Sequence, residues 1–269
     1  MSALQTQPMF TAMDSKLAIS ETTIDSTKAG TVTRWCTNNW KAIFAEFVAT
    51  SSLLLFGCMG QCKLDGQETP ALYGPLGFGC VVAMNIQIFG HISGAHMNPA
   101  VSLGASLFGT LSLPVMLGYV VAQCAGAVVG FGLLSLLAAE TLIPDGMCST
   151  LPREDINGLQ ALGIEIVLTA ALNFVNCGVW DPRNKHLQDS VPIKFALVIT
   201  GMSIAGGPLT GASMNPARSL GPALWNSTWQ YHWLYWIGPL FGGSLSVLAY
   251  RLIIVDVSSS SLLLKEIPH

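Results

Sequence analysis

Two short segments of the chain place polar side chains in otherwise apolar sequence. Residues 94–104 and 211–221 are identical at nine of eleven positions, and each contains the triplet Asn-Pro-Ala. Asn is a favoured N-cap and Pro is favoured at the next position, so each triplet predicts the start of a short helix. A helix N-terminus carries a partial positive charge, and an Asn that caps it keeps amide N–H donors that can face a cavity. The six residues are Asn98, Pro99 and Ala100 in the first segment and Asn215, Pro216 and Ala217 in the second.

Three isolated charges accompany these segments. Glu46 lies in Ala-Glu-Phe-Val-Ala-Thr, and Glu165, 119 positions later, lies in Ile-Glu-Ile-Val-Leu-Thr. Carboxylates in such apolar surroundings often mark a proton relay. Arg218 is the only charged residue between positions 195 and 250. Because a charge at membrane depth is costly, we expect Arg218 to face a cavity or the interior of a helix bundle; the alternative is an arginine that reaches out to the membrane interface.

The composition places the chain in a membrane. Hydrophobic residues make up 51% and charged residues 10% of its 269 residues, the formal net charge is −3, and residues 69–139 contain no Asp, Glu, Lys or Arg. This composition excludes a polybasic nucleic-acid-binding protein and a disordered chain. The sequence shows no cysteines with metal-ligand spacing, no phosphate-binding loop and no set of nucleophile, base and acid. We therefore expect no metal, no cofactor and no enzymatic activity.

Six apolar segments are long enough to cross a bilayer, which takes about 20 residues of helix. Two further apolar segments, 98–110 and 215–226, are too short to cross. We expect them to be re-entrant half-helices beside a polar cavity, because irregular backbone at membrane depth must be enclosed. The sequence thus predicts an all-α membrane protein with six transmembrane helices and two half-helices. The predicted spans are 42–60, 72–92, 113–139, 156–179, 192–207 and 232–255.

The two matching segments divide the chain into two repeats. Three spans per repeat is an odd number, so the second repeat must be inverted, and the N-termini of the half-helices are expected to meet near the bilayer midplane. Nine of the eleven Lys and Arg residues other than Arg218 fall on the side of the termini, which predicts that both termini are cytoplasmic. The expected parts are a disordered cytoplasmic tail at 1–39, a first repeat at 40–139, an extracellular loop at 140–155, a second repeat at 156–256 and a cytoplasmic tail at 257–269.

Small residues carry two further expectations. They recur at every fourth position in the third and sixth predicted spans, a spacing that allows close helix packing in membranes. Among the seven cysteines, Cys62 and Cys148 fall on the predicted outer side, where they are candidates for a disulfide. The small residues at every fourth position are Gly118, Ala122, Gly126 and Gly130 in the third span, and Gly238, Gly242 and Ser246 in the sixth.

The sequences Ser-Gly-Ala-His-Met-Asn-Pro-Ala at 93–100 and Asn-Pro-Ala-Arg-Ser at 215–219 resemble the paired signature of the aquaporin, or major intrinsic protein, family. The resemblance covers residues 41–250. It implies an aquaporin-like bundle that forms a homotetramer in the plasma membrane, with one pore per subunit for water or small neutral solutes. It also implies that Glu46 and Glu165 accept hydrogen bonds from the re-entrant loops rather than relay protons. Arg218 would be the arginine of an outer constriction, which donates to solutes and repels cations.

The resemblance assigns three more residues to that constriction by spacing. They are Phe78, 20 positions before Asn98, and Ser203 and Ala212, which precede Asn215 by 12 and three positions. Strict water channels carry His at the position of Ser203 and often Cys at that of Ala212, so a wider passage is expected here. An apolar ring opposite an arginine suits a polyol. These features predict a channel for glycerol, water and other small neutral solutes such as urea.

Other positions resemble water channels instead. Ser219 and Ala223 stand where typical glycerol facilitators carry Asp and a basic residue, and Tyr235-Trp236 is a water-channel pair. A water-channel frame with a small residue in place of the constriction His resembles the insect glycerol channels called entomoglyceroporins. A water-selective channel remains one alternative, and a membrane-junction protein with an incidental pore is another. His96, just before the first triplet, is expected to line the cytoplasmic vestibule.

Overall fold

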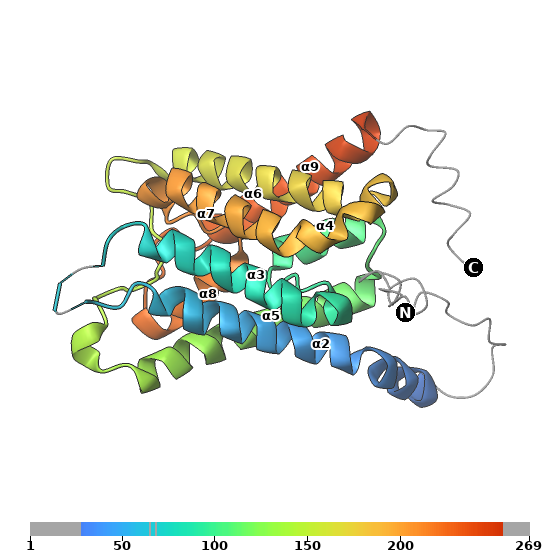
Figure 1. Cartoon of the computed structure of the whole chain (residues 1–269), viewed down its shortest axis with the longest axis horizontal. Coiled ribbons are helices and arrows are strands. Elements are labelled where there is room, and N and C mark those ends of the chain that lie inside the picture. The colour runs from blue at the N-terminus through green and yellow to red at the C-terminus, as the bar shows by residue number, and fades with distance from the viewer. Residues whose placement is uncertain (1–27, 65, 68, 255–269) are drawn as a thin grey trace, which may run out of the picture.

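The computed structural model describes residues 28–64, 66–67 and 69–254, whose regular elements are helices apart from one isolated β-bridge between Leu64 and Gln67 (Figure 1). The six long helices are α2 (Lys28–Met59), α3 (Tyr73–Ser93), α5 (Leu113–Leu137), α6 (Gly158–Trp180), α7 (Val191–Thr210) and α9 (Leu234–Ile253). The short elements are the α-helices α4 (Pro99–Phe108) and α8 (Pro216–Asn226) and the 3₁₀ segments η1 (Glu140–Leu142) and η2 (Pro182–Ser190). Residues 1–27 of the tail predicted at 1–39, and the whole tail predicted at 257–269, lie outside the described residues.

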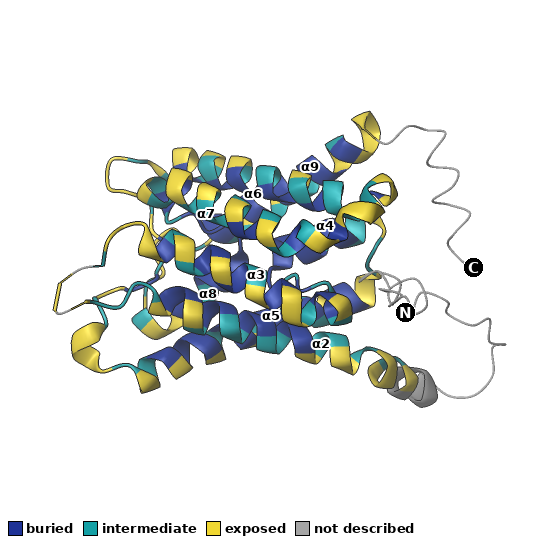
Figure 2. Ribbon diagram, in the orientation of Figure 1, coloured by how far each residue is buried: buried dark blue, intermediate teal, exposed yellow. Residues whose placement is uncertain are grey.

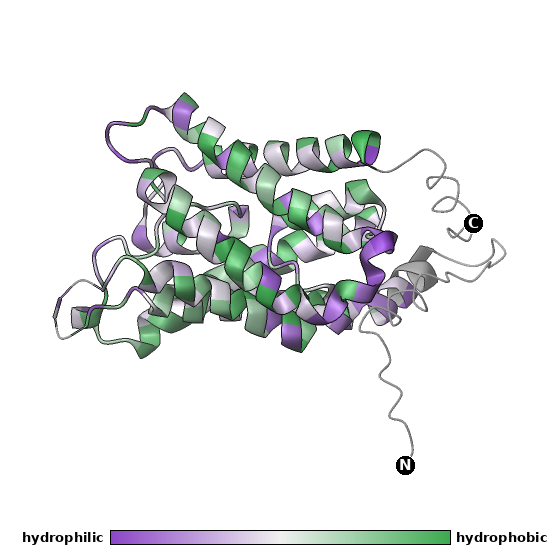
Figure 3. Cartoon of the chain, turned by 45° about the horizontal axis from the view of Figure 1, so that its top comes forward, coloured by the Kyte–Doolittle hydropathy of each residue, from purple (hydrophilic) through white to green (hydrophobic). Residues whose placement is uncertain are grey.

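The six long helices are apolar enough to cross a membrane, and they form one bundle (Figure 1). Exposed residues lie on the outward sides of the helices, and buried residues face one another (Figure 2). Hydrophilic residues gather toward the loops and helix ends (Figure 3). The expected all-α fold with six spanning helices and two half-helices is therefore confirmed. Large apolar side chains exposed on the outer surface, as contact with lipid requires, include Leu117, Val121, Leu136, Val167, Leu197 and Leu252.

The first helix is longer than the sequence predicts. α2 begins at Lys28, so the assignment of residues 28–39 to a disordered tail is wrong. No proline interrupts this helix, and its polar extension is continuous with the apolar span; within it Asn39 Nδ2 donates to Trp35 O at 2.8 Å. Polar composition marks the edge of the membrane, but it does not end a helix. The hydropathy pattern therefore places the start of the helix too late.

The two repeats pack in the same way around the half-helices. α2 packs on α5 in the first repeat, and α6 packs on α9 in the second. The half-helices cross over between the repeats, because α4 packs mainly on α9 and α8 packs mainly on α5. Each half-helix is thus held against a long helix of the other repeat, inside the bundle (Figure 1). This arrangement provides the enclosure that irregular backbone at membrane depth needs.

Glycines allow the paired helices to approach closely. A Cβ on Gly130 of α5 would lie 2.1 Å from the carbonyl oxygen of Ser51 in α2. In the second repeat, a Cβ on Gly242 of α9 would lie 2.2 Å from the carbonyl oxygen of Ile166 in α6. The small residues spaced by four in α5 and α9 therefore mark close helix contacts, as the sequence predicts.

We expect Gly130→Ala to destabilise the bundle, because the new methyl group would overlap a backbone oxygen that cannot rotate away. Overpacking a tight core costs about 1–3 kcal/mol, so the midpoint of thermal unfolding in detergent should fall. The control is Gly163→Ala in α6, where, beyond the adjoining residues of its own helix, no described atom lies within 4 Å of the added carbon. Equal unfolding midpoints for the two variants would show that α2 and α5 can move apart at Gly130 without loss of stability.

Candidate functional site

A cavity of about 2070 Å³ runs through the bundle, since its lining includes residues at both ends. Gln61 and Asp145 line one mouth, among the loops that follow α2 and α5. His91 and Trp180 line the other mouth, where α3 and α6 end. The cavity is thus a candidate path across the membrane. The residues along it that the sequence singled out are Phe78, His96, Asn98, Ser203, Ala212, Asn215 and Arg218.

Each half-helix is capped by the Asn of its triplet. Asn98 Oδ1 accepts a hydrogen bond from Ala100 N at 2.8 Å, at the start of α4. Asn215 Oδ1 accepts a hydrogen bond from Ala217 N at 3.0 Å, at the start of α8. The proline after each Asn occupies the first turn of its helix, as the sequence predicts. Both triplets therefore place a helix N-terminus, with its partial positive charge, at the cavity.

The amide nitrogens of the two caps join the loops that precede the half-helices. Asn98 Nδ2 donates to Met214 O, and Asn215 Nδ2 donates to Met97 O, each at 2.8 Å. Each cap is therefore bonded to the residue just before the other, which brings the two half-helix N-termini together inside the bundle. This differs from the expectation that the amide donors simply face the cavity. Each amide thus donates one of its two N–H groups to the opposite loop.

The loops before the half-helices adopt matching left-handed backbone conformations. In the first loop φ is 49° at Ala95 and 53° at Met97, and in the second it is 44° at Ala212 and 52° at Met214. Residues other than glycine adopt such conformations at a cost of roughly 1–3 kcal/mol each. Other contacts must therefore hold the loops in place.

Two buried carboxylates supply these contacts. Glu46 accepts hydrogen bonds from the backbone N–H groups of His96 and Met97 at 2.8 and 2.7 Å, and from Gln123 Nε2 at 2.8 Å. Glu165 accepts from the two equivalent N–H groups of the second loop at 2.9 and 2.8 Å. The bonds satisfy N–H groups that water cannot reach. Among the described residues, neither carboxylate lines the cavity, which argues against a proton relay along it.

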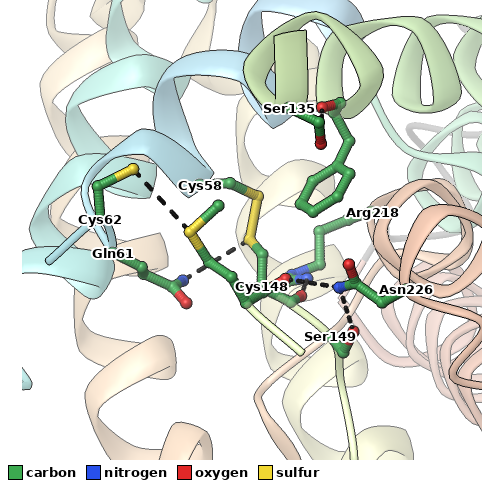
Figure 4. The surroundings of a disulfide bond; sticks show 10 residues. Cys58, Gln61, Cys62, Ser135, Cys148, Ser149, Arg218 and Asn226 are labelled. Atoms are coloured by element: carbon green, nitrogen blue, oxygen red, sulfur yellow. Dashed lines mark hydrogen bonds between the residues drawn. A yellow bond between two sulfur atoms is a disulfide. The ribbon is translucent and has the colours of Figure 1, made fainter. Parts of the chain in front are cut away.

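Arg218 lies inside the bundle, with 8% of its surface exposed. Its Nη1 donates to the carbonyl oxygen of Cys148, in the loop between α5 and α6 (Figure 4). Its Cζ lies 4.9 Å from the centroid of the Phe78 ring. The alternative of an arginine that reaches out to the membrane interface is therefore wrong. The pair presents N–H donors beside an apolar ring at one level of the cavity.

Two small side chains complete the set assigned to the outer constriction. Ser203 comes from α7, and Ala212 comes from the left-handed loop before α8, where it is buried. Both line the cavity together with Phe78 and Arg218. All four residues thus line the same cavity, although they come from α3, α7, α8 and a loop that lie far apart in the sequence.

A disulfide fixes the loop that holds Arg218. It joins Cys58, in the last turn of α2, to Cys148 (Figure 4). The candidate pairing of Cys148 with Cys62 is not the one formed. Cys62 is a free cysteine whose Sγ lies 4.0 Å from Met147 Sδ, and burial raises the pKa of its thiol. Cys58 belongs to an apolar span, where a cysteine is typically a small hydrophobic residue. Its direction toward the loop has no signal in the sequence.

The opposite mouth is lined by aromatic and polar side chains. His96 Nδ1 lies 3.0 Å from Ser102 Oγ, and its ring meets Tyr119 edge-on with centroids 5.5 Å apart. The polar extension of α2 also contributes Arg34 and Asn38 to the lining. Sequence reasoning missed these two residues because it placed them in the tail.

An ion pair stabilises the connection beside this mouth. Arg183 Nη2 lies 2.5 Å from Asp181 Oδ2, and the Tyr250 hydroxyl donates to the same oxygen at 3.0 Å. Hydrogen bonds from Arg183 lower the pKa of the buried Asp181 carboxyl, against the opposing effect of burial. In the part of the chain that the structure describes, no group of three or more His, Cys, Asp or Glu residues is placed to hold a metal ion.

The profile of the family described as "Major intrinsic protein" matches residues 33–250. This chain belongs to that family. The Aquaporin-4 of Mus musculus is 36% identical over 226 residues, which cover 81% of this chain and 68% of the relative. The Aquaporin-1 of Homo sapiens is 35% identical over 228 residues, which cover 82% and 84%. The X-ray structure of the aquaglyceroporin from Plasmodium falciparum matches with a TM-score of 0.72 at 25% identity, covering 82% of this chain and 99% of that chain.

Membership of the major intrinsic protein family relates the cavity to transport across the membrane. Aquaporins are membrane channels, so the protein is a multi-pass membrane channel, and the cavity is the candidate for its path. The Asn residues of the two triplets that carry the family resemblance, Asn98 and Asn215, line this cavity where α4 and α8 begin.

We expect Glu165→Gln to loosen the second loop, because the amide replaces one acceptor oxygen by a donor that faces other donors. A buried N–H left without its acceptor costs about 1–3 kcal/mol, so thermal unfolding should begin at a lower temperature and solute flux through the channel should fall. Glu154→Gln, in an exposed loop, is the control. If both variants had the same unfolding temperature and the same solute flux, the Glu165 carboxylate would not be what holds the loop.

Proposed function

We propose that this protein is a passive channel that conducts glycerol and water, together with other small neutral solutes such as urea, and that excludes protons and ions. The observation that carries the proposal is the outer constriction, defined as Phe78, Ser203, Ala212 and Arg218. These residues line one cavity, and two of them have small side chains.

The chemistry of the constriction suits a polyol. A hydroxymethyl and a methyl group leave a wider opening than an imidazole at the same place would leave. The ring of Phe78 offers an apolar face to the carbon atoms of glycerol, and Arg218, with its Cζ 4.9 Å from the ring centroid, offers N–H donors to the hydroxyl groups. Donors in fixed positions offset the hydration that the solute loses on entry.

Charge along the path supports the exclusion of cations and protons. Arg218 places a positive charge at the outer constriction, and the N-termini of α4 and α8 add partial positive charge near Asn98 and Asn215. Each Asn amide keeps one N–H for the path, so a water molecule there is held as an acceptor. We propose that this interrupts the chain of water molecules along which protons would pass.

The remaining site residues have supporting roles in this proposal. Glu46 and Glu165 hold the loops that lead into the half-helices, in agreement with the backbone N–H groups that they accept. His96 lines the cytoplasmic vestibule.

A water-selective channel is the second candidate. Ser219, Ala223 and the pair Tyr235-Trp236 favour it, because they resemble the corresponding residues of water channels. The relatives at 35–36% identity compared above are named aquaporins, whereas the solved structure compared above is named an aquaglyceroporin. We favour glycerol because the constriction residues contact the solute and the frame residues do not. The combination is the one that resembles the insect glycerol channels.

We also propose that the protein is a homotetramer of the plasma membrane with both termini in the cytoplasm. α2 begins and α9 ends at the same end of the bundle (Figure 1). Arg183, between α6 and α7, donates to Ile254 O and so lies at this end too. Basic residues gathered at one end support a cytoplasmic position for that end.

The proposal predicts that proteoliposomes containing this protein take up both water and glycerol faster than empty liposomes. Stopped-flow light scattering measures both, with a water gradient in one experiment and a glycerol gradient in the other. Fast water flux with glycerol and urea fluxes equal to those of empty liposomes would contradict the proposal and favour the water-selective channel.

We expect Ser203→His to reduce glycerol permeability far more than water permeability, because the imidazole fills the space that a polyol needs. One added group in a tight pocket changes the preference between a larger and a smaller solute by about tenfold or more. Ser203→Ala keeps the small size and is the matched control, so it should retain glycerol flux. Parallel loss of both fluxes in Ser203→His would show that Ser203 does not discriminate between the solutes.

A further inference from the structure

The ring of Phe78 occupies space left by a glycine behind it. A Cβ built on Gly57 of α2 would lie 2.8 Å from Cδ1 and Cε1 and 3.1 Å from Cζ of the Phe78 ring. Carbon atoms in good contact are about 3.5–4.0 Å apart. One edge of the ring therefore lies where the side chain of any other residue at position 57 would begin. The ring also lines the cavity, although only 8% of the residue is exposed.

A larger residue at position 57 would displace the Phe78 ring rather than the backbone of α2 or α3, because other contacts hold these two helices in place. Cys58, the next residue, is bonded to Cys148, so this turn of α2 cannot move without the loop that holds Arg218. A Cβ on Gly77 of α3 would lie 3.7 Å from Gly57 O, so α2 and α3 are already close at this level. The open space next to the ring is the cavity that it lines. A displaced ring would narrow that cavity near Arg218.

We infer that Gly57 is a specificity-determining residue of this channel, which sets the width of the outer constriction by leaving room for the Phe78 ring on the side of α2. Gly57 is not among the residues that line the cavity in the described chain. It acts on the solute through Phe78 and is a positioning residue. The inference rests on the proposed function, because it concerns the passage of a solute larger than water.

The experiment compares Gly57→Ala with Gly77→Ala in proteoliposomes. Both variants add one methyl group between α2 and α3, but only the methyl at position 57 overlaps the ring, while the one at position 77 meets ordinary contacts at 3.7 Å and beyond. One extra carbon in a tight pocket discriminates by about tenfold, so the ratio of glycerol to water permeability should fall about tenfold in Gly57→Ala. Gly77→Ala should keep the wild-type ratio. An unchanged ratio in Gly57→Ala would overturn the inference.

A second variant separates the effect on the ring from a general loss of folded protein. The permeability ratio is measured on molecules that still conduct water, so it is independent of the folded fraction. In a Phe78→Leu background the ring is gone, and adding Gly57→Ala should leave the ratio where Phe78→Leu alone puts it. If Gly57→Ala lowers the ratio equally with and without the ring, Phe78 does not mediate its effect and the inference fails.

The outcome for the wild-type protein distinguishes failure of this inference from failure of the proposed function. If the wild-type channel conducts water but no glycerol, the proposed function fails. The role of Gly57 is then tested by the water permeability of the two variants. A ring pushed into the path narrows it for any solute, so Gly57→Ala would still conduct less water than Gly77→Ala. Equal water permeability in the two variants would overturn the role of Gly57 itself.

Discussion

The need to satisfy backbone N–H groups where water is absent governs this fold. The half-helices α4 and α8 meet inside the bundle because the loops leading into them turn through left-handed backbone conformations. The backbone N–H groups of these loops point to two buried carboxylates: Glu46 accepts those of the first loop, and Glu165 accepts those of the second. A carboxylate has two oxygens that accept several donors at once. The positions of Asn98 and Asn215, and with them the chemistry at the middle of the path, depend on these two buried side chains.

Functional asymmetry is concentrated where the two repeats differ. When residues 94–104 are aligned with residues 211–221, they differ at two positions: His96 aligns with Ser213, and Val101 aligns with Arg218. All four residues line the cavity. The shared positions form the scaffold of caps and left-handed residues, while the differing positions give the two halves of the path an imidazole and a guanidinium. A nearly symmetrical frame thereby carries different ionisable side chains, His96 and Arg218, in its two halves.

The sequence predicts the features whose signals are local or repeated. Hydropathy defines the six spans, and the Asn-Pro pairs define where the half-helices begin. It does not predict contacts that depend on the direction of a side chain in three dimensions. Cys58 and Cys62 are only four residues apart, and only folding shows that Cys58 faces the loop. The bond from Asn98 to the opposite loop likewise needs both repeats in place. Gly57 looks like any small residue in a span until the ring of Phe78 is placed against it.

The bond between Cys58 and Cys148 bears on how the protein is made. Its sulfur atoms belong to residues 90 positions apart, with α3, α4 and α5 between them. It can therefore close only after three spans have been threaded through the bilayer and the loop after α5 has reached the side of Cys58. Disulfides persist where thiols are oxidised, as in the lumen of the secretory pathway. Closure of this bond therefore requires both thiols to lie together on an oxidising side of the membrane, after the spans of the first repeat have been inserted.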